Sequence, residues 1–137
     1  MGAKLLLYHC GEEKTKKIQT AVSVMGIAVE SLDEGALGQK LGKLAGLEEF
    51  SEEQPSDWTG EVPETEVLIM CGFSKIQFDL LMNLFKRGKT PRVVLKAMLT
   101  DTNQNWMLGK LIGELEEEHA YMHRKRKAEP KSLHDEE

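Results

Sequence analysis

Residues 66–118 read EVLIMCGFSKIQFDLLMNLFKRGKTPRVVLKAMLTDTNQNWMLGKLIGELEEE, and this stretch decides the fold. It opens with the unbroken apolar run 67–71, which is too short for a helix and is typical of a strand covered on both faces. Ser74 and Gln77 then form a capping-box pattern, which predicts a helix start. A second β-like run, 93–99, leads into a polar loop and another amphipathic helix. This order is typical of the crossover units of α/β folds.

The first half of the chain carries the same order of patterns. Residues 4–9 (KLLLYH) form a β-like run that is ended by a Cys-Gly pair, just as a second Cys-Gly pair ends the run at 67–71. An amphipathic helix is predicted to follow, and then a strand over residues 27–32 whose polar residues favour a sheet edge. A short helix is predicted after Asp33, although glycines at every fourth position lower its intrinsic stability.

These patterns predict an α/β fold: a small, four-stranded, mostly parallel sheet with helices on both faces. If the helix after Asp33 is irregular, the remaining order instead allows a ferredoxin-like α+β fold with an antiparallel sheet. Residues 1–123 are expected to form a single domain, with an acidic, loosely packed connection at about 48–66 that Trp58 pins to the body. Residues 124–137 are expected to be a disordered charged tail.

The composition argues against two classes of protein. A net charge of −5 does not suit a nucleic-acid binder that works by neutralising phosphates. No apolar run approaches the ~20 residues needed to cross a bilayer, and the N-terminus is unlike a secretory signal. Two cysteines are too few for a disulfide framework and are expected to be reduced. We therefore expect a cytoplasmic protein that binds neither nucleic acid nor membrane.

Polar side chains gather in the loops that follow the predicted strands. In a parallel sheet these loops share one edge, and ligands bind there. Hydroxyls and amides at helix N-termini are suited to a small anionic ligand or to a partner protein. The candidate residues are Ser74, Lys96, Thr100, Thr102, Asn103, Asn105 and Trp106. The competing interpretation is structural: turn and cap hydrogen bonds for the hydroxyls and amides, a lid over the core for the indole, and sheet-edge protection for the lysine.

A second hypothesis concerns the two cysteines. If the first and third strands are neighbours, Cys10 and Cys71 are expected to lie close together beside His9. Two thiolates and an imidazole are suited to hold a soft metal ion, and the thiols alone are suited to form a redox pair. The alternative is that each thiol ends a core strand as a small hydrophobe, and the absence of a CxxC motif favours this alternative.

The segment KAMLTDTNQNWMLGKLIGELEEEH, residues 96–119, resembles DUF3783, a bacterial domain family of unknown function. CGFS at residues 71–74 belongs to the same likeness, which covers roughly the second half of the chain. Its most specific part is the loop that contains Thr102-Asn103 and Asn105-Trp106. The resemblance implies a bacterial origin and makes this loop a family signature. It transfers no catalytic residue, because the family has no assigned activity.

No enzyme chemistry is evident in the sequence. There is no nucleophile with a matching base and no pair of acids at a recognisable spacing, and the sequence leaves the cofactor unknown. We therefore expect a small binding or regulatory module that engages a partner protein or a small anionic ligand. The metal or thiol redox protein is the alternative, and self-association is compatible with either.

Overall fold

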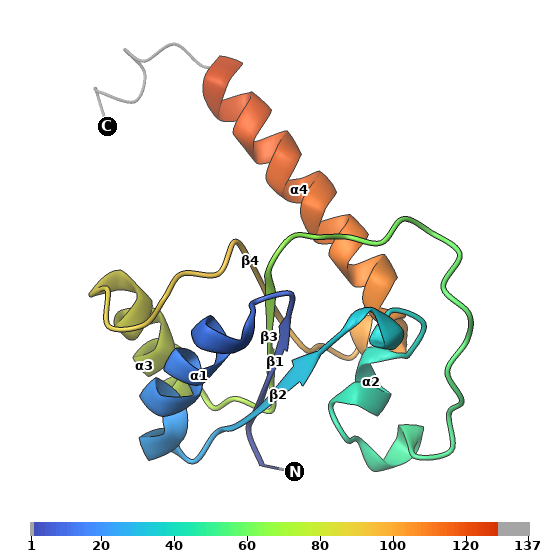
Figure 1. The fold of residues 1–137 in the computed structure, drawn as a ribbon, viewed down its shortest axis with the longest axis horizontal. Helices are drawn as coiled ribbons and strands as arrows, with labels where there is room; N and C mark the ends of the chain where they lie inside the picture. Colours follow the sequence, from blue (N-terminus) through green and yellow to red (C-terminus); the bar gives the residue numbers. More distant parts are fainter. Residues whose placement is uncertain (1, 129–137) are drawn as a thin grey trace.

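The computed structural model describes residues 2–128 of the chain, which build one four-stranded sheet in the order β2-β1-β3-β4 (Figure 1). The strands are β1 (Lys4–Tyr8), β2 (Ala28–Leu32), β3 (Val67–Cys71) and β4 (Leu95–Met98). β1 pairs in parallel with β2, β3 pairs in parallel with β4, and β1 pairs antiparallel with β3. The α/β fold with a mostly parallel sheet is therefore confirmed, with one antiparallel pair at its centre. The ferredoxin-like alternative requires an antiparallel sheet, which these pairings rule out.

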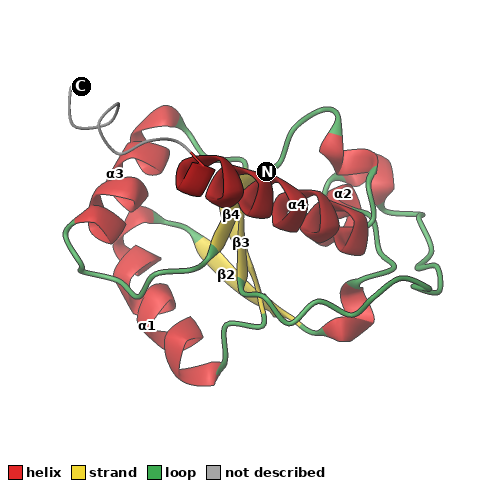
Figure 2. Ribbon diagram, turned by 90° about the horizontal axis from the view of Figure 1, so that it is seen from above, coloured by secondary structure: helices red, strands yellow, loops and turns green. Residues whose placement is uncertain are grey.

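Helices cover both faces of the sheet, as predicted (Figure 2). α1 (Glu12–Val22) and α3 (Lys75–Lys86) lie on one face. α2 (Leu41–Leu44) and α4 (Leu108–Ala128) lie on the other. Short 3-10 turns precede or follow these helices: η1 (Ser23–Met25), η2 (Glu34–Ala36), η3 (Glu48–Phe50) and η4 (Asn103–Asn105).

The two central strands divide the hydrophobic core in two. Successive side chains of a strand point to opposite faces, so Leu5 and Leu7 pack against α1 and α3 while Leu6 packs against α2 and α4. All five residues of β3 are buried, as its unbroken apolar run predicts. Each fully buried aliphatic side chain contributes roughly 1.5–3 kcal/mol to folding, so the central strands hold the domain together.

Helix α3 begins and ends where the sequence predicts. The backbone N–H of Gln77 donates to the Ser74 hydroxyl oxygen at 3.1 Å, and the backbone N–H of Ser74 donates to the Gln77 side chain at 2.9 Å. This reciprocal pair satisfies two amides that the helix leaves free. At the other end Gly88 takes the left-handed conformation, with φ 70°, and stops the helix.

The connection between the halves is irregular and largely exposed, and a few contacts anchor it to the body of the domain. Ser56 N donates to Gly38 O at 2.9 Å, and the buried hydroxyl of Tyr8 donates to Pro63 O at 2.7 Å. The Trp58 indole packs against Gly109 at the start of α4, so it does pin the connection to the body.

The carboxyl end of α4 extends further than expected. We predicted that residues 124–137 form a disordered tail, yet residues 124–128 belong to α4. Residues 129–137 of that predicted tail lie outside the described residues.

The order and pairing of the strands match on the two sides of the β1–β3 pair, at whose centre Leu6 and Ile69 face each other. We call residues 4–46 the first unit and residues 67–113 the second unit. Each unit contains, in order, a strand, a helix, a parallel neighbouring strand, a 3-10 turn and a further helix, and the first unit has the additional turn η1 before its second strand. The domain is thus built from two similar units that share one sheet.

A symmetric pair of backbone hydrogen bonds joins the ends of the two units. Leu41 N donates to Trp106 O at 2.9 Å, and Leu108 N donates to Gln39 O at 2.9 Å. The helices that start here, α2 and α4, both open with the sequence LGKL. The first strands also match, because each is followed by a residue with positive φ: His9 at 58° and Gly72 at 67°.

Candidate functional site

Because the sheet is mixed, the carboxyl ends of its strands do not all lie on the same side of the sheet. The carboxyl ends of β1 and β2 lie at one edge, and those of β3 and β4 lie at the opposite edge. Ser74 and the loop beginning at Thr100 therefore share an edge, whereas Gly11, at the start of α1, lies at the other. The expected meeting of all the strand-end loops at one place does not occur, because β3 runs against β1.

The same antiparallel register separates the two cysteines and corrects the expectation that they meet. Cys71 pairs with Lys4 at the start of β1, whereas Cys10 follows the other end of that strand. A five-residue strand spans roughly 17 Å, so the two thiols cannot share one metal ion or form a disulfide. Within residues 2–128 no three His, Cys, Asp or Glu side chains are grouped as a metal site requires.

Each thiol instead behaves as a small core residue. Cys10 and Cys71 are both free and buried. Burial raises the pKa of the Cys10 thiol from 9.0 to about 11, with Glu66 adding to the shift. Burial likewise raises the pKa of Cys71 from 9.0 to about 12. Both groups are therefore protonated and weakly nucleophilic at neutral pH.

The Thr100–Asn103 turn uses most of its polar groups internally. The Thr100 backbone N–H donates to the Asn103 side-chain oxygen at 2.8 Å, and the Asn103 backbone N–H donates to the Thr100 hydroxyl at 3.0 Å. The Asn103 amide also donates to Met98 O at 2.9 Å, and the side chain is buried. These bonds fold the chain between β4 and α4, which is the structural interpretation of the loop.

The other candidate residues of this loop are Thr102, Asn105 and Trp106. The Asn105 amide reaches Asp101 O at 3.4 Å, and Thr102 stands exposed before η4 without a capping bond from its side chain. Trp106 packs, half-buried, against the core between the sheet and α4, and the Lys110 ammonium lies 4.8 Å from the centre of its ring. The indole is thus a lid over the core.

Ser74 and Lys96 also have structural partners. The Ser74 hydroxyl is engaged in the cap of α3. Lys96 lies on the edge strand β4, where its ammonium donates to Val93 O at 3.1 Å and sits 5.0 Å from the centre of the Phe85 ring. Partial burial, together with the charge of Arg92, lowers the pKa of this lysine.

A hollow of the described surface lies on the opposite side of the sheet, beside the carboxyl ends of β1 and β2. This β1–β2 cleft has a volume of 990 Å³ and is open to solvent. The cleft is lined by residues that follow β1, by residues of α1, by the end of β2 and by the turn after it: His9, Cys10, Gly11, Glu12, Thr15, Lys16, Gln19, Ser31, Leu32, Asp33, Glu34 and Gly35.

His9 has an unusual backbone at the mouth of this cleft. Its φ of 58° lies in the left-handed region, which costs a non-glycine residue roughly 1 kcal/mol. The second unit has Gly72 at the equivalent position, where this conformation carries no such cost. The imidazole contacts the Glu34 carboxylate at 3.2 Å and packs on the Tyr8 ring. The chain therefore keeps an imidazole where glycine would suit the backbone better.

The cleft also depends on a small residue of α1. Thr15 is the fourth residue of α1, and the fourth residue of α3 is Phe78, whose ring packs against the core. A threonine in place of a phenylalanine leaves room at the sheet edge. The Thr15 hydroxyl oxygen is buried and has no hydrogen-bond partner among the described residues.

The charge of the cleft is predominantly negative. Glu12, Asp33 and Glu34 contribute carboxylates, while Lys16 is the basic lining residue and its ammonium lies 3.3 Å from Glu12. The Asp33 carboxylate accepts the backbone N–H of Gly35 at 2.8 Å and so fixes the turn after β2. Two acidic residues in the first turn of α1 offset the positive end of its helix dipole.

Sequence reasoning found only part of this cleft. His9 and Cys10 were selected as metal ligands, whereas Thr15, Asp33 and Glu34 were not considered as site residues. The missed signal is the repeated LGKL sequence, which aligns the two units. That alignment sets His9 against a glycine and Thr15 against a phenylalanine, and so marks where the first unit has changed.

The fold and the cleft define a small α/β domain, made of two similar units, with a polar recess at one edge of its sheet. Residues 66–122 match the model of the family described as Domain of unknown function (DUF3783). This match extends from the residue before β3 into α4, so it covers the second unit of the domain. Comparisons with curated proteins and with solved structures found no significant match. Within the described part of the chain, no helix combines the length and apolar character of a membrane span.

Proposed function

We propose that this chain is a cytoplasmic binding module that recognises a partner protein at the β1–β2 cleft. The observation that carries the proposal is His9, held in a costly backbone conformation with its imidazole on Glu34 at the mouth of the cleft. Backbone strain of this kind tends to persist at sites that use the strained side chain. The buried free thiols are compatible with a reducing compartment.

The charge of the cleft selects the chemistry of the partner. A small anion would face Glu12, Asp33 and Glu34, and this repulsion opposes its binding. A lysine or arginine side chain from a partner protein would instead find carboxylate acceptors in the solvent-open cleft. We therefore favour a partner protein with an exposed basic side chain over the small anionic ligand.

The test is an NMR titration of the whole chain with the peptide acetyl-Gly-Arg-Gly-amide. We expect amide resonances of residues 9–16 and 31–35 to shift together. Glu34→Gln should weaken binding about tenfold, because a hydrogen bond to a charged group contributes roughly 1.5 kcal/mol or more. Glu49→Gln, at an exposed position on η3 outside the cleft, is the matched control and should leave the titration unchanged. Equal shifts with acetyl-Gly-Glu-Gly-amide, or shifts outside the cleft, would refute the proposal.

A second variant separates binding from folding. His9→Gly removes the imidazole and gives the backbone the residue that Gly72 supplies in the second unit. We expect unchanged or slightly higher stability in urea unfolding, because the relief of left-handed strain offsets the entropy cost of glycine. We also expect weaker peptide binding. A marked loss of stability with unchanged binding would show that His9 serves the fold.

A further inference from the structure

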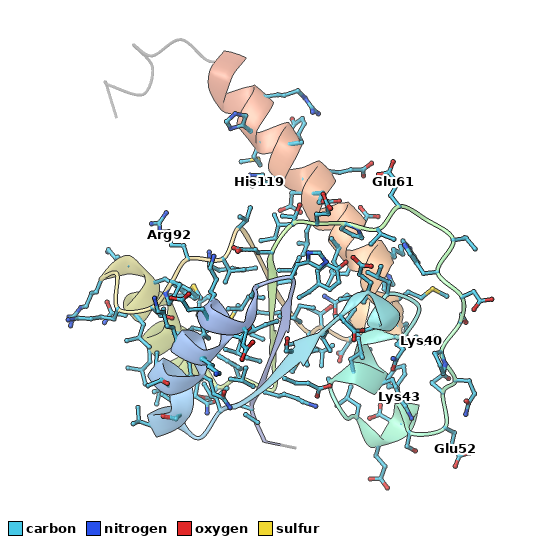
Figure 3. All side chains as sticks on the ribbon, viewed as in Figure 1. Lys40, Lys43, Glu52, Glu61, Arg92 and His119 are labelled. Atoms are coloured by element: carbon cyan, nitrogen blue, oxygen red, sulfur yellow. The ribbon has the colours of Figure 1, made fainter. Side chains whose placement is uncertain are left out.

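The carboxyl part of α4 stands clear of the body of the domain (Figure 1). Its first turns are anchored by the buried residues Leu108, Leu111 and Ile112. Every residue from Glu117 to Lys125 is exposed. Figure 3 places His119 on this projecting segment, away from the sheet and from the other helices. The projecting segment is defined as residues 117–128.

A helix of this length has little stability of its own in water. Isolated helices shorter than ~12–15 residues are marginal, and most helical stability in proteins comes from the packing of one face. No ion pair among the described residues joins two side chains of α4. Over residues 117–125, the part of the segment whose side chains the structure describes, α4 therefore gains support from neither packing nor ion pairs between its own side chains.

Opposite charges are separated along this helix. Residues 114–118 read ELEEE, and residues 123–127 read HRKRK. Between these blocks lie two large apolar side chains, Tyr121 at 55% exposure and Met122 at 47%. An apolar centre flanked by an acidic block on one side and a basic block on the other is self-complementary when two such helices run antiparallel.

We propose that the projecting segment binds the same segment of a second copy of this chain in antiparallel orientation. The two-fold axis of the pair lies near Tyr121 and Met122, which cover each other across it. The acidic block of each copy then faces the basic block of the other, on both sides of the axis. A parallel pair would place like charges against each other.

The charge pattern opposes other occupants. A nucleic acid or an anionic membrane would be attracted by residues 123–127 but repelled by the four glutamates that precede them on the same helix. The pair is small, because the segment spans only roughly 18 Å at 1.5 Å per residue. The dimer should therefore be weak, reversible and sensitive to salt.

Sedimentation velocity of the full chain over a wide range of concentration tests the proposal. We expect a monomer–dimer equilibrium that shifts toward monomer at high salt. Glu117→Lys/Glu118→Lys and Arg124→Glu/Lys125→Glu should each abolish the homodimer. Mixing the two variants should restore a dimer, because one helix is then basic and the other acidic. Glu48→Lys/Glu49→Lys changes the same charge at exposed positions on η3 and should leave dimerisation intact.

Crosslinking tests the orientation. Tyr121→Cys should form a disulfide-linked dimer rapidly on mild oxidation, since the two sulfurs meet near the axis. Glu114→Cys, one and a half turns or more from the axis, should crosslink much more slowly. Circular dichroism verifies that each variant remains folded. A wild-type chain that stays monomeric at every concentration, or a dimer unaffected by both charge reversals, would overturn the proposal.

Discussion

Three buried acidic groups, Tyr8, Cys10 and Cys71, all have a raised pKa. Burial is the main cause in each case, and for the Tyr8 hydroxyl it raises the pKa from 10.0 to about 12, with Glu34 adding to the shift. The native fold therefore favours the neutral forms of these side chains. Since the unfolded chain ionises them at lower pH, their contribution is complete below about pH 9 and is lost as the pH rises through the folded values.

We expect the free energy of unfolding to fall steadily between about pH 9 and pH 11. Urea unfolding measured across this range provides the test. Cys71→Ala, which removes one of the three titrating groups, should flatten the curve relative to the wild type. Two results would contradict the attribution of this pH dependence to the buried groups. One is an unfolding free energy that does not change above pH 9, and the other is a pH dependence that is equally steep in Cys71→Ala and in the wild type. Native Cys10 and Cys71 should also react slowly with a thiol reagent at neutral pH, in contrast to the urea-unfolded chain.

At the scale of elements, Trp58 and Gly109 attach the irregular connection to α4. A methyl group added at Gly109 would lie 2.5 Å from the indole of Trp58, which is too close for real contacts. The indole can approach the helix this closely only because residue 109 has no side chain. Glycine is otherwise unfavourable inside a helix, so its presence here reflects the contact with Trp58.

Gly109→Ala should lower stability by about 1–3 kcal/mol, because overpacking displaces the indole. Gly113→Ala is the matched control on the same helix: nothing lies within 4 Å of its added methyl group, so it should raise stability by roughly 0.5–1 kcal/mol through helix propensity alone. Thermal unfolding measures both changes. If the two substitutions shift the unfolding midpoint in the same direction, the packing of Trp58 against α4 does not require glycine at position 109.

Local signals predicted the elements well. The apolar run at Val67–Cys71 matches β3 residue for residue, and the Ser74–Gln77 pattern matches the cap of α3. Both depend on short stretches whose chemistry allows one conformation. The direction of β3 against β1 was not predictable in this way, because it depends on the path of the irregular connection and on its anchor points at Tyr8 and Gly38.

The candidate site also depends on contacts between distant segments, which local sequence signals do not predict. Thr100 and Asn103 look like ligand groups in the sequence because their types suit an anion, but their mutual hydrogen bonds appear only in three dimensions. The β1–β2 cleft combines residues from β1, α1 and the turn after β2, so no single motif marks it. The imidazole of His9 suggests metal chemistry in the sequence, whereas its left-handed backbone angle is visible only in the structure.

The two units share the central β1–β3 pair, and neither is expected to be stable alone. A chain of residues 66–128 would expose the edge of β3 that β1 covers, together with apolar surface on both faces of that strand. We expect this fragment, expressed without the first unit, not to persist as a folded monomer. Circular dichroism combined with light scattering provides the measurement, and a cooperatively folded monomer would contradict the prediction.

The bonds between Gln39, Leu41, Trp106 and Leu108 involve only main-chain atoms. Main-chain hydrogen bonds place little demand on side-chain identity. Either unit can therefore accept substitutions here and keep its hydrogen bonds to the other unit. Such tolerance accounts for two units that match in their order of elements while His9 stands at the position of Gly72 and Thr15 at that of Phe78. It also leaves the first half free to acquire a recess of its own while the second half preserves the shared scaffold.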